Sequence, residues 1–211
     1  MKSQRRLLLG LALTGCAGFI DAVGFIELGG YYTSFMSGNT TQLGTAFLNA
    51  EPLLLPFGLV AMFFLGSVLG AMLALRGRRL GPSLVLTFVM GSIGATLLLG
   101  SFGVPATLSM LVLALGAGAQ NATLPFSGGA RLGTTFVSGT LFAAGQDLAG
   151  AIFGVVPKWR WVQHLQVWAA LLLGAMAGAL IYRQLGLAVI LVPGAVYLAM
   201  AIGFVFRSPA E

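Results

Sequence analysis

Charged residues are scarce in this chain. Only 8% of its 211 residues are charged and 58% are hydrophobic, whereas soluble domains carry about 25% charged residues. This scarcity excludes a soluble globular protein, because even a large core leaves a polar surface. Apolar runs of roughly 20 residues recur, a length that crosses the hydrocarbon of a bilayer as helix. They lack the alternation of barrel strands, so the composition predicts an all-α integral membrane protein with one domain over residues 1–211.

Cysteine and histidine are almost missing, with Cys16 and His164 the single residues of their kinds. An internal disulfide and a cysteine-based metal site are therefore excluded, and no metal or cofactor is expected. No basic or acidic side chain is placed to activate a serine, so an enzyme is not expected. The net charge of +6 is typical of cytoplasmic loops. The expected partners are the lipid bilayer and an unknown small solute or ion, without nucleic acid, and a homo-oligomer is left open.

Six apolar segments are each long enough to span a membrane. The topology therefore depends on whether two shorter ones, 34–50 and 134–153, also cross it. If the short segments cross fully, Lys and Arg divide six against five between the two sides. If both enter and return on the same side, ten lie on one side and only Arg183 on the other. Lys and Arg collect in cytoplasmic loops, so we expect six spans, two re-entrant elements and both termini in the cytoplasm, with full crossing as the alternative. The six predicted spans are 7–27, 53–75, 82–101, 106–126, 163–182 and 186–206.

The two halves of the chain resemble each other. Three blocks recur in the same order, namely GFIDA (18–22) with GAQNA (118–122), TSFMSGNTTQLG (33–44) with TTFVSGTLFAAG (134–145), and a Gly-x-x-x-Gly pair (66–70) with another (174–178). Each half then contains three crossings, an odd number, so the second half is expected to be inverted relative to the first. Inverted repeats of this kind are common in transporters and place the functional site near the midplane. The repeats are predicted at about 7–101 and 106–206.

The Ser-Gly blocks are predicted to form the tips of the re-entrant elements. In the first, residues 31–37 form an extended arm, Gly38 permits a sharp turn, and Ser37 or Asn39 caps a half-helix. In the second, residues 134–137 form the arm. Two half-helix N-termini would then meet near the midplane, where their unpaired N–H groups suit an anion, a carbonyl-bearing solute or water. The alternative is that these residues only cap and pack helices. The candidate site residues of the two blocks are Ser37, Gly38, Asn39, Thr40, Ser138, Gly139 and Thr140.

Asp21 is the sharpest single candidate, because a carboxylate within a span costs at least about 2.5 kcal/mol unless it is paired or faces water. The repeat relates it to Asn121, and the two would mark opposite ends of one path, with Gln120 a weaker candidate beside it. Asp21 at one end is compatible with proton or cation coupling. The alternative is that Asp21 crosslinks the first re-entrant loop as a buried structural residue. Asp147 lacks an acidic counterpart in the first half, which is compatible with a functional asymmetry or with pairing to a cytoplasmic Arg.

The ordered set GFIDAVGF, SFMSGNTTQLG, GAQNA and TTFVSGTL resembles the YoaK-like family of bacterial membrane proteins, a domain of unknown function (1275), over about residues 8–205. The resemblance implies a protein of the bacterial inner membrane and supplies no substrate or catalytic residue. Together with the inverted repeat, it favours a small-solute or ion transporter or channel with a midplane site between the repeats. The alternative is a non-transporting membrane scaffold or partner subunit.

Overall fold

The computed structural model describes residues 2–49, 52–77, 80–124 and 137–206. Within these ranges every regular element is a helix, which confirms the all-α class. In chain order the elements are α1 (Lys2–Glu27), α2 (Met36–Asn49), α3 (Leu54–Ala74), α4 (Leu80–Ser101), α5 (Ala106–Gln120), α6 (Val137–Ile152), α7 (Arg160–Leu185), the 3₁₀ helix η1 (Gly186–Ile190) and α8 (Leu191–Val205).

Four segments of the described chain are long and apolar enough to cross a membrane, namely Gln4–Glu27, Leu54–Ala74, Leu80–Ser101 and Arg160–Val205. The fourth has 46 residues and is made of α7, η1 and α8. Gly186 ends α7 with a φ of 54° and a ψ of −145°, a positive-φ conformation that glycine adopts readily. This segment therefore contains two apolar helices of 26 and 15 residues, where the sequence predicted spans at 163–182 and 186–206.

Helix α5 is shorter than the predicted span at 106–126. It has 15 residues, roughly 22 Å, and ends at Gln120. A turn follows, in which the Ala122 N–H donates to the Ala119 carbonyl at 2.9 Å. Pro125 lies just beyond, and the residue before a proline avoids the helical conformation. The predicted span ran past this end although Gln120, Asn121 and Thr123 are polar, because a few polar residues scarcely lower the mean hydropathy of a long window; the last two predicted residues lie outside the described ranges.

The first helix of each half packs against the third helix of the other half, α1 along α7 and α3 along α5. Glycines permit the close approach. A Cβ at Gly174 would collide with the carbonyl oxygen of Gly15 in α1, and a Cβ at Gly66 would collide with that of Leu115 in α5. Gly174 and Gly66 hold matching places in the two Gly-x-x-x-Gly pairs, so the two halves use the same contact.

The opposite sides of these interfaces match as well. A Cβ at Gly18 of α1 would collide with the Leu171 carbonyl of α7, and a Cβ at Gly118 of α5 would collide with the Phe63 carbonyl of α3. Gly18 and Gly118 open the GFIDA and GAQNA blocks. The internal repeat seen in the sequence therefore corresponds to two equivalent helix crossings, in which each helix contributes glycines.

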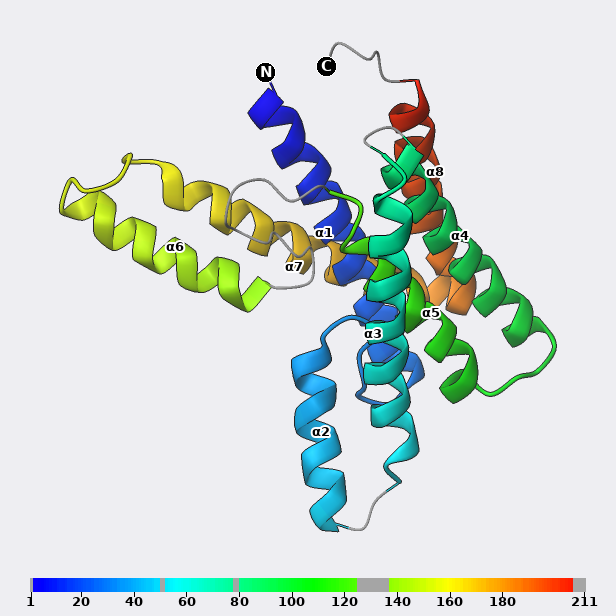
Figure 1. Cartoon of the computed structure of the whole chain (residues 1–211). Coiled ribbons are helices and arrows are strands. Elements are labelled where there is room, and N and C mark those ends of the chain that lie inside the picture. The colour runs from blue at the N-terminus through cyan, green and yellow to red at the C-terminus, as the bar shows by residue number, and fades with distance from the viewer. Residues whose placement is uncertain (1, 50–51, 78–79, 125–136, 207–211) are drawn as a thin grey trace.

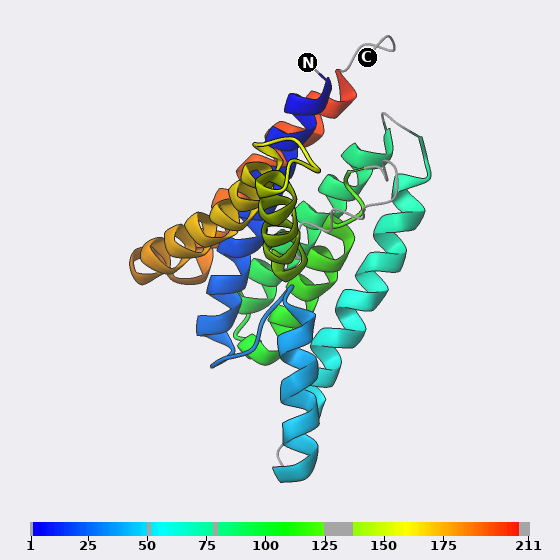
Figure 2. The same ribbon diagram turned by 90° about the vertical axis from the view of Figure 1, so that its left-hand side faces the viewer.

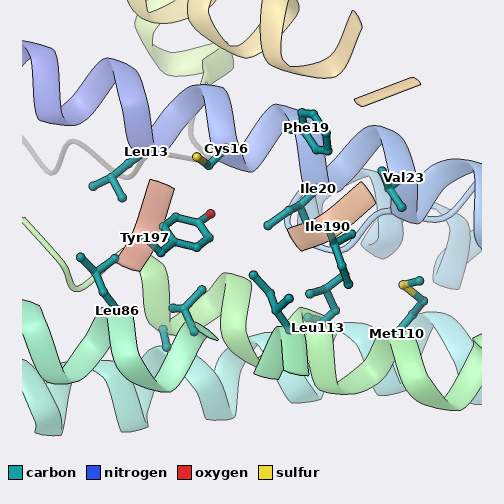
Figure 3. Packing of buried hydrophobic residues seen from close by; sticks show 14 of the residues in the cluster. Leu13, Cys16, Phe19, Ile20, Val23, Leu86, Met110, Leu113, Ile190 and Tyr197 are labelled. Carbon is teal, nitrogen blue, oxygen red and sulfur yellow. The ribbon is translucent and has the colours of Figure 1, made fainter. Parts of the chain in front are cut away.

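Side chains from α1, α3, α4, α5, η1 and α8 form the centre of the molecule, part of which is drawn in Figure 3. Leu13 of α1, Leu86 of α4 and Tyr197 of α8 are fully buried there. The Tyr197 hydroxyl donates to Gln120 Oε1 at 2.6 Å, and Gln120 Nε2 donates to the Leu13 carbonyl at 2.9 Å. This polar link joins α8, α5 and α1 inside an otherwise apolar core.

The two short helices lie outside this centre and run in different directions (Figures 1 and 2). Helix α2 begins near the middle of the molecule and runs to the end where α3 begins. Helix α6 also begins near the middle, but in Figure 1 it runs mainly to the side, away from the central helices. The N-terminal end of α1 and the C-terminal end of α8 both lie at the top in the two views, at the end of the molecule opposite to the end of α2.

Candidate functional site

The Asp21 carboxylate binds the segment that precedes α2. Its Oδ1 accepts hydrogen bonds from the backbone N–H of Thr33 at 2.9 Å, from the Thr33 hydroxyl at 2.9 Å and from the backbone N–H of Ser34 at 2.6 Å. Its Oδ2 accepts from the Ser34 hydroxyl at 2.6 Å. Thr33 and Ser34 are both buried. Asp21 therefore crosslinks α1 to this segment, which is the structural role that the sequence left open as an alternative.

Asn39 closes the same loop from the other side. It is fully buried, its Oδ1 accepts from the Tyr32 N–H at 2.9 Å, and its Nδ2 donates to the Tyr32 carbonyl at 2.6 Å. The side-chain amide thus pairs with one backbone residue as a neighbouring strand would. Gln42 adds a third link, because its Nε2 donates to the Gly30 carbonyl at 2.7 Å.

The predicted turn at Gly38 is wrong. Helix α2 begins at Met36, so Ser37, Gly38 and Asn39 all lie in its first turn, and the arm comprises the preceding residues. Glycine is accommodated at this position for a different reason: a Cβ on Gly38 would lie 2.6 Å from the Phe35 ring and 3.1 Å from the Tyr32 ring.

The unpaired N–H groups expected at the start of α2 are largely satisfied. The N–H groups of Gly38 and Asn39 donate to the Phe35 carbonyl, and that of Met36 donates to the Ser34 carbonyl. The nearby anionic group is Asp21, which belongs to the chain itself. The start of α2 is therefore a poor site for an external anion, because its donors are used and a carboxylate stands beside it.

The start of α6 is more open. Ser138 and Gly139 are exposed, and a Cβ on Gly139 would meet nothing within 4 Å. Thr140 is buried, and its hydroxyl donates to the Val137 carbonyl at 2.7 Å. In α2 the exposed Thr40 hydroxyl likewise bonds within its own helix, to the Met36 carbonyl at 2.8 Å. The predicted arm at 134–136 lies outside the described residues.

A cavity of about 510 Å³ lies where α1, α7, the segment before α2 and the start of α6 meet. Asp21, Tyr32 and Ser138 carry side-chain oxygens in its lining, and Asp21 and Ser138 come from different halves of the chain. Aromatic rings were not singled out in the sequence, although Tyr32 and Phe35 stand inside the first predicted arm. They line the cavity together with Phe25 and Trp168.

Asn121 and Gln120 do not share this cavity with Asp21 among the described residues. Asn121 follows the last residue of α5, and its Nδ2 donates to the Ala117 carbonyl at 3.3 Å. Gln120 is buried in the centre of the molecule, bonded to α1 and α8. The structure thus brings Ser138 to Asp21, while the two α5 residues belong to the core side of α1.

Asp147 joins the other end of α6 to α7. Its Oδ2 lies 2.8 Å from Arg160 Nε and 3.2 Å from His164 Nε2, so the pairing alternative from the sequence holds, with His164 in addition. The hydrogen bond from the Arg160 guanidinium and the positive charge beside it hold the pKa of the Asp147 carboxyl below its usual range. This ion pair fixes α6 at the end remote from the cavity.

Comparisons with known proteins found a family model and a relative that match most of the chain. A family described as a protein of unknown function (DUF1275) matches residues 9–203. A UPF0700 transmembrane protein from Rhizobium meliloti (strain 1021) is 34% identical over 189 residues, which cover 87% of this chain and 80% of the relative. No solved structure matches the chain.

Proposed function

The chain belongs to the DUF1275 family of unknown function and is a multi-pass membrane protein, and we propose that it is a small-solute or ion transporter or channel. In this proposal six helices cross the bacterial inner membrane as two inverted three-helix repeats. Helices α2 and α6 are the re-entrant half-helices, and both termini are cytoplasmic. The solute binds near the midplane, between the starts of the two half-helices, and no enzymatic step is involved.

Three observations support this topology. Helices α2 and α6 both begin near the middle of the molecule (Figures 1 and 2), where the tip of a re-entrant half-helix is expected; length alone does not set them apart, because α5 and α8 have 15 residues each. The start of α1 and the end of α8 lie at the same end of the molecule (Figures 1 and 2), as an even number of crossings requires. The matched glycine contacts of α1 with α7 and of α3 with α5 are what an internal two-fold relation predicts.

The observation that carries the proposal is the cavity itself. Its volume of about 510 Å³ falls in the range of small-molecule sites, about 300–1,000 Å³. It lies between the starts of the two short helices and contains a carboxylate, which is costly in a membrane and is found there mainly along solute or ion paths. Its lining is mainly apolar and aromatic with few polar groups, which is the usual character of a small-molecule site.

Thiol labelling tests whether the cavity reaches water. In a Cys16→Ala background, Ser138→Cys places a thiol in the cavity, and Leu173→Cys places one on α7 at a residue that is 63% exposed but does not line it. A charged, membrane-impermeant thiol reagent applied to each side of oriented membrane vesicles is expected to modify the first thiol from at least one side. The second should remain unmodified, because it faces lipid.

The second candidate function is the non-transporting scaffold or partner subunit. It is favoured by the four hydrogen bonds of Asp21, which all stay within the chain. In that case the thiol of Ser138→Cys is unmodified from both sides, and the transport proposal fails.

A further inference from the structure

We propose that the cavity binds a bulky organic cation, such as a lipophilic ammonium or phosphonium ion. This inference rests on the proposed function and names the substrate class of the same site. It combines three properties of the cavity: a carboxylate without a cationic partner among the described residues, a set of aromatic rings, and a volume too large for a bare ion.

The charge of Asp21 has no cationic partner within the described chain. Its four hydrogen-bond donors are hydroxyl and backbone N–H groups of Thr33 and Ser34, all neutral. No Lys, Arg or His is among the described residues that line the cavity. Neutral donors reduce the cost of burying a carboxylate, but they leave its net charge in place. A cation in the cavity would supply the missing opposite charge, whereas an anion would be repelled.

Aromatic rings line the same cavity as this carboxylate. Tyr32 lies between two phenylalanines, with ring centroids 5.1 Å from Phe25 and 5.1 Å from Phe35. Trp168 of α7 also lines the cavity and is 39% exposed. Rings that present their faces to a cation attract it through their quadrupole, and tryptophan does so best. Aromatic walls of this kind suit alkylated cations, which keep little water around their charge.

A metal ion fits the cavity poorly. Hard cations such as Ca²⁺ and Mg²⁺ take six or more oxygen ligands, and the described residues contain no group of three or more His, Cys, Asp or Glu side chains able to hold a metal. Oxygen ligands are also few along the wall, where Asp21 and Ser138 stand among apolar groups. The apolar wall matches the hydrocarbon body of an organic cation, and the carboxylate matches its charge.

Two ions of almost the same shape and opposite charge test the proposal. Tetraphenylphosphonium and tetraphenylborate are titrated by equilibrium dialysis against the purified full-length protein in detergent. We expect the phosphonium ion to bind at least about tenfold more tightly than the borate, since the carboxylate attracts one and repels the other. The phosphonium ion should also protect Ser138→Cys from the thiol reagent. Equal affinities for the two ions would overturn the proposal.

Matched variants show which residues cause the preference for the phosphonium ion. Asp21→Asn should abolish most of the preference for the phosphonium ion, while Ser34→Ala, which removes one hydrogen bond from Asp21 but keeps its charge, should retain it. Trp168→Leu should weaken phosphonium binding by about two- to fivefold. Its control, Trp159→Leu, changes an exposed tryptophan outside the cavity and should have no effect.

The outcomes separate this inference from the proposed function. If Ser138→Cys is modified but the phosphonium ion neither binds nor protects it, the water path stands and the cation site is wrong. A folded Asp21→Asn variant that keeps the original preference also shows that the cation site is wrong. If that variant does not fold, equal affinities of Trp168→Leu and Trp159→Leu overturn the inference. A thiol that is unmodified from both sides refutes the proposed function itself.

Discussion

The two short helices begin in similar sequence, TSFMSGN and TTFVSGT, but they are held at opposite ends. Helix α2 is fixed at its start, through the bonds of Asp21 and Asn39 to the preceding segment. Helix α6 is fixed near its end, through Asp147 and Arg160, and its start exposes Ser138 and Gly139. Both starts reach the same cavity. A hydrogen-bonded helix start is therefore paired with an open one, and a rearrangement in the proposed transport cycle is expected at α6.

Removing the Asp21 carboxylate should produce the largest difference in stability between the two halves. Asp21→Ala leaves two backbone N–H groups and two hydroxyls without their acceptor, which should destabilise the protein by about 3–5 kcal/mol. Asn121→Ala, at the matching place in the second half, should cost about 1 kcal/mol or less. Unfolding by SDS titration in mixed micelles measures both. Equal losses would mean that the halves are anchored alike.

Substitutions at the two glycine crossings, α1 with α7 and α3 with α5, should destabilise the protein equally, because the two halves make the same contact there. Gly174→Ala and Gly66→Ala each drive a Cβ into a backbone carbonyl that cannot rotate away, and each should cost about 1–3 kcal/mol. Gly91→Ala is the control, since a Cβ there meets nothing within 4 Å, and it should be neutral or stabilising. The same titration compares the three. A loss confined to one crossing would contradict the internal two-fold relation.

The glycines of the Ser-Gly blocks should respond with opposite signs. Gly38→Ala pushes a methyl group against the rings of Phe35 and Tyr32 and should destabilise by about 1–2 kcal/mol. Gly139→Ala enters open space at the start of α6 and should stabilise by about 0.5 kcal/mol, because alanine favours helix. Melting temperatures in detergent give the signs directly. A destabilising Gly139→Ala would show that the start of α6 is as closely packed as that of α2.

The smallest expected effect is the pH dependence of the stability that the Asp147–Arg160 ion pair contributes. The pKa of Asp147 is lowered in the folded state by Arg160, so its contribution to stability is present above the unfolded value of about 3.9 and is lost as the pH falls through the lower folded value. The melting temperature of the native protein should therefore exceed that of Asp147→Asn at pH 7. The gap should close below about pH 4 and shrink in high salt. A gap that stays constant with pH would contradict the ion pair.

Much of the fold could be predicted from local features of the sequence. The short helices were expected at 34–50 and 134–153 and occur at Met36–Asn49 and Val137–Ile152. Helix ends were less predictable, as the stop at Gln120 shows, because hydropathy averaged over a long window does not register where a turn begins. The site was found in part. Asp21 and Ser138 were named, whereas Phe25 and Trp168 were missed, because an aromatic residue in a membrane helix carries no sign of which neighbour it faces.

Composition and periodicity by themselves determined that this chain is a helical membrane protein with a repeated Ser-Gly block, because the cost of burying charge and backbone in lipid acts on every residue separately. Only the tertiary structure decided what the polar residues do. Asp21 meets Thr33 and Ser34 because the chain turns back after α1, and Ser138 joins them from more than a hundred residues away. Such partners depend on which helices cross, and the crossings depend on glycines whose neighbours lie in the other half.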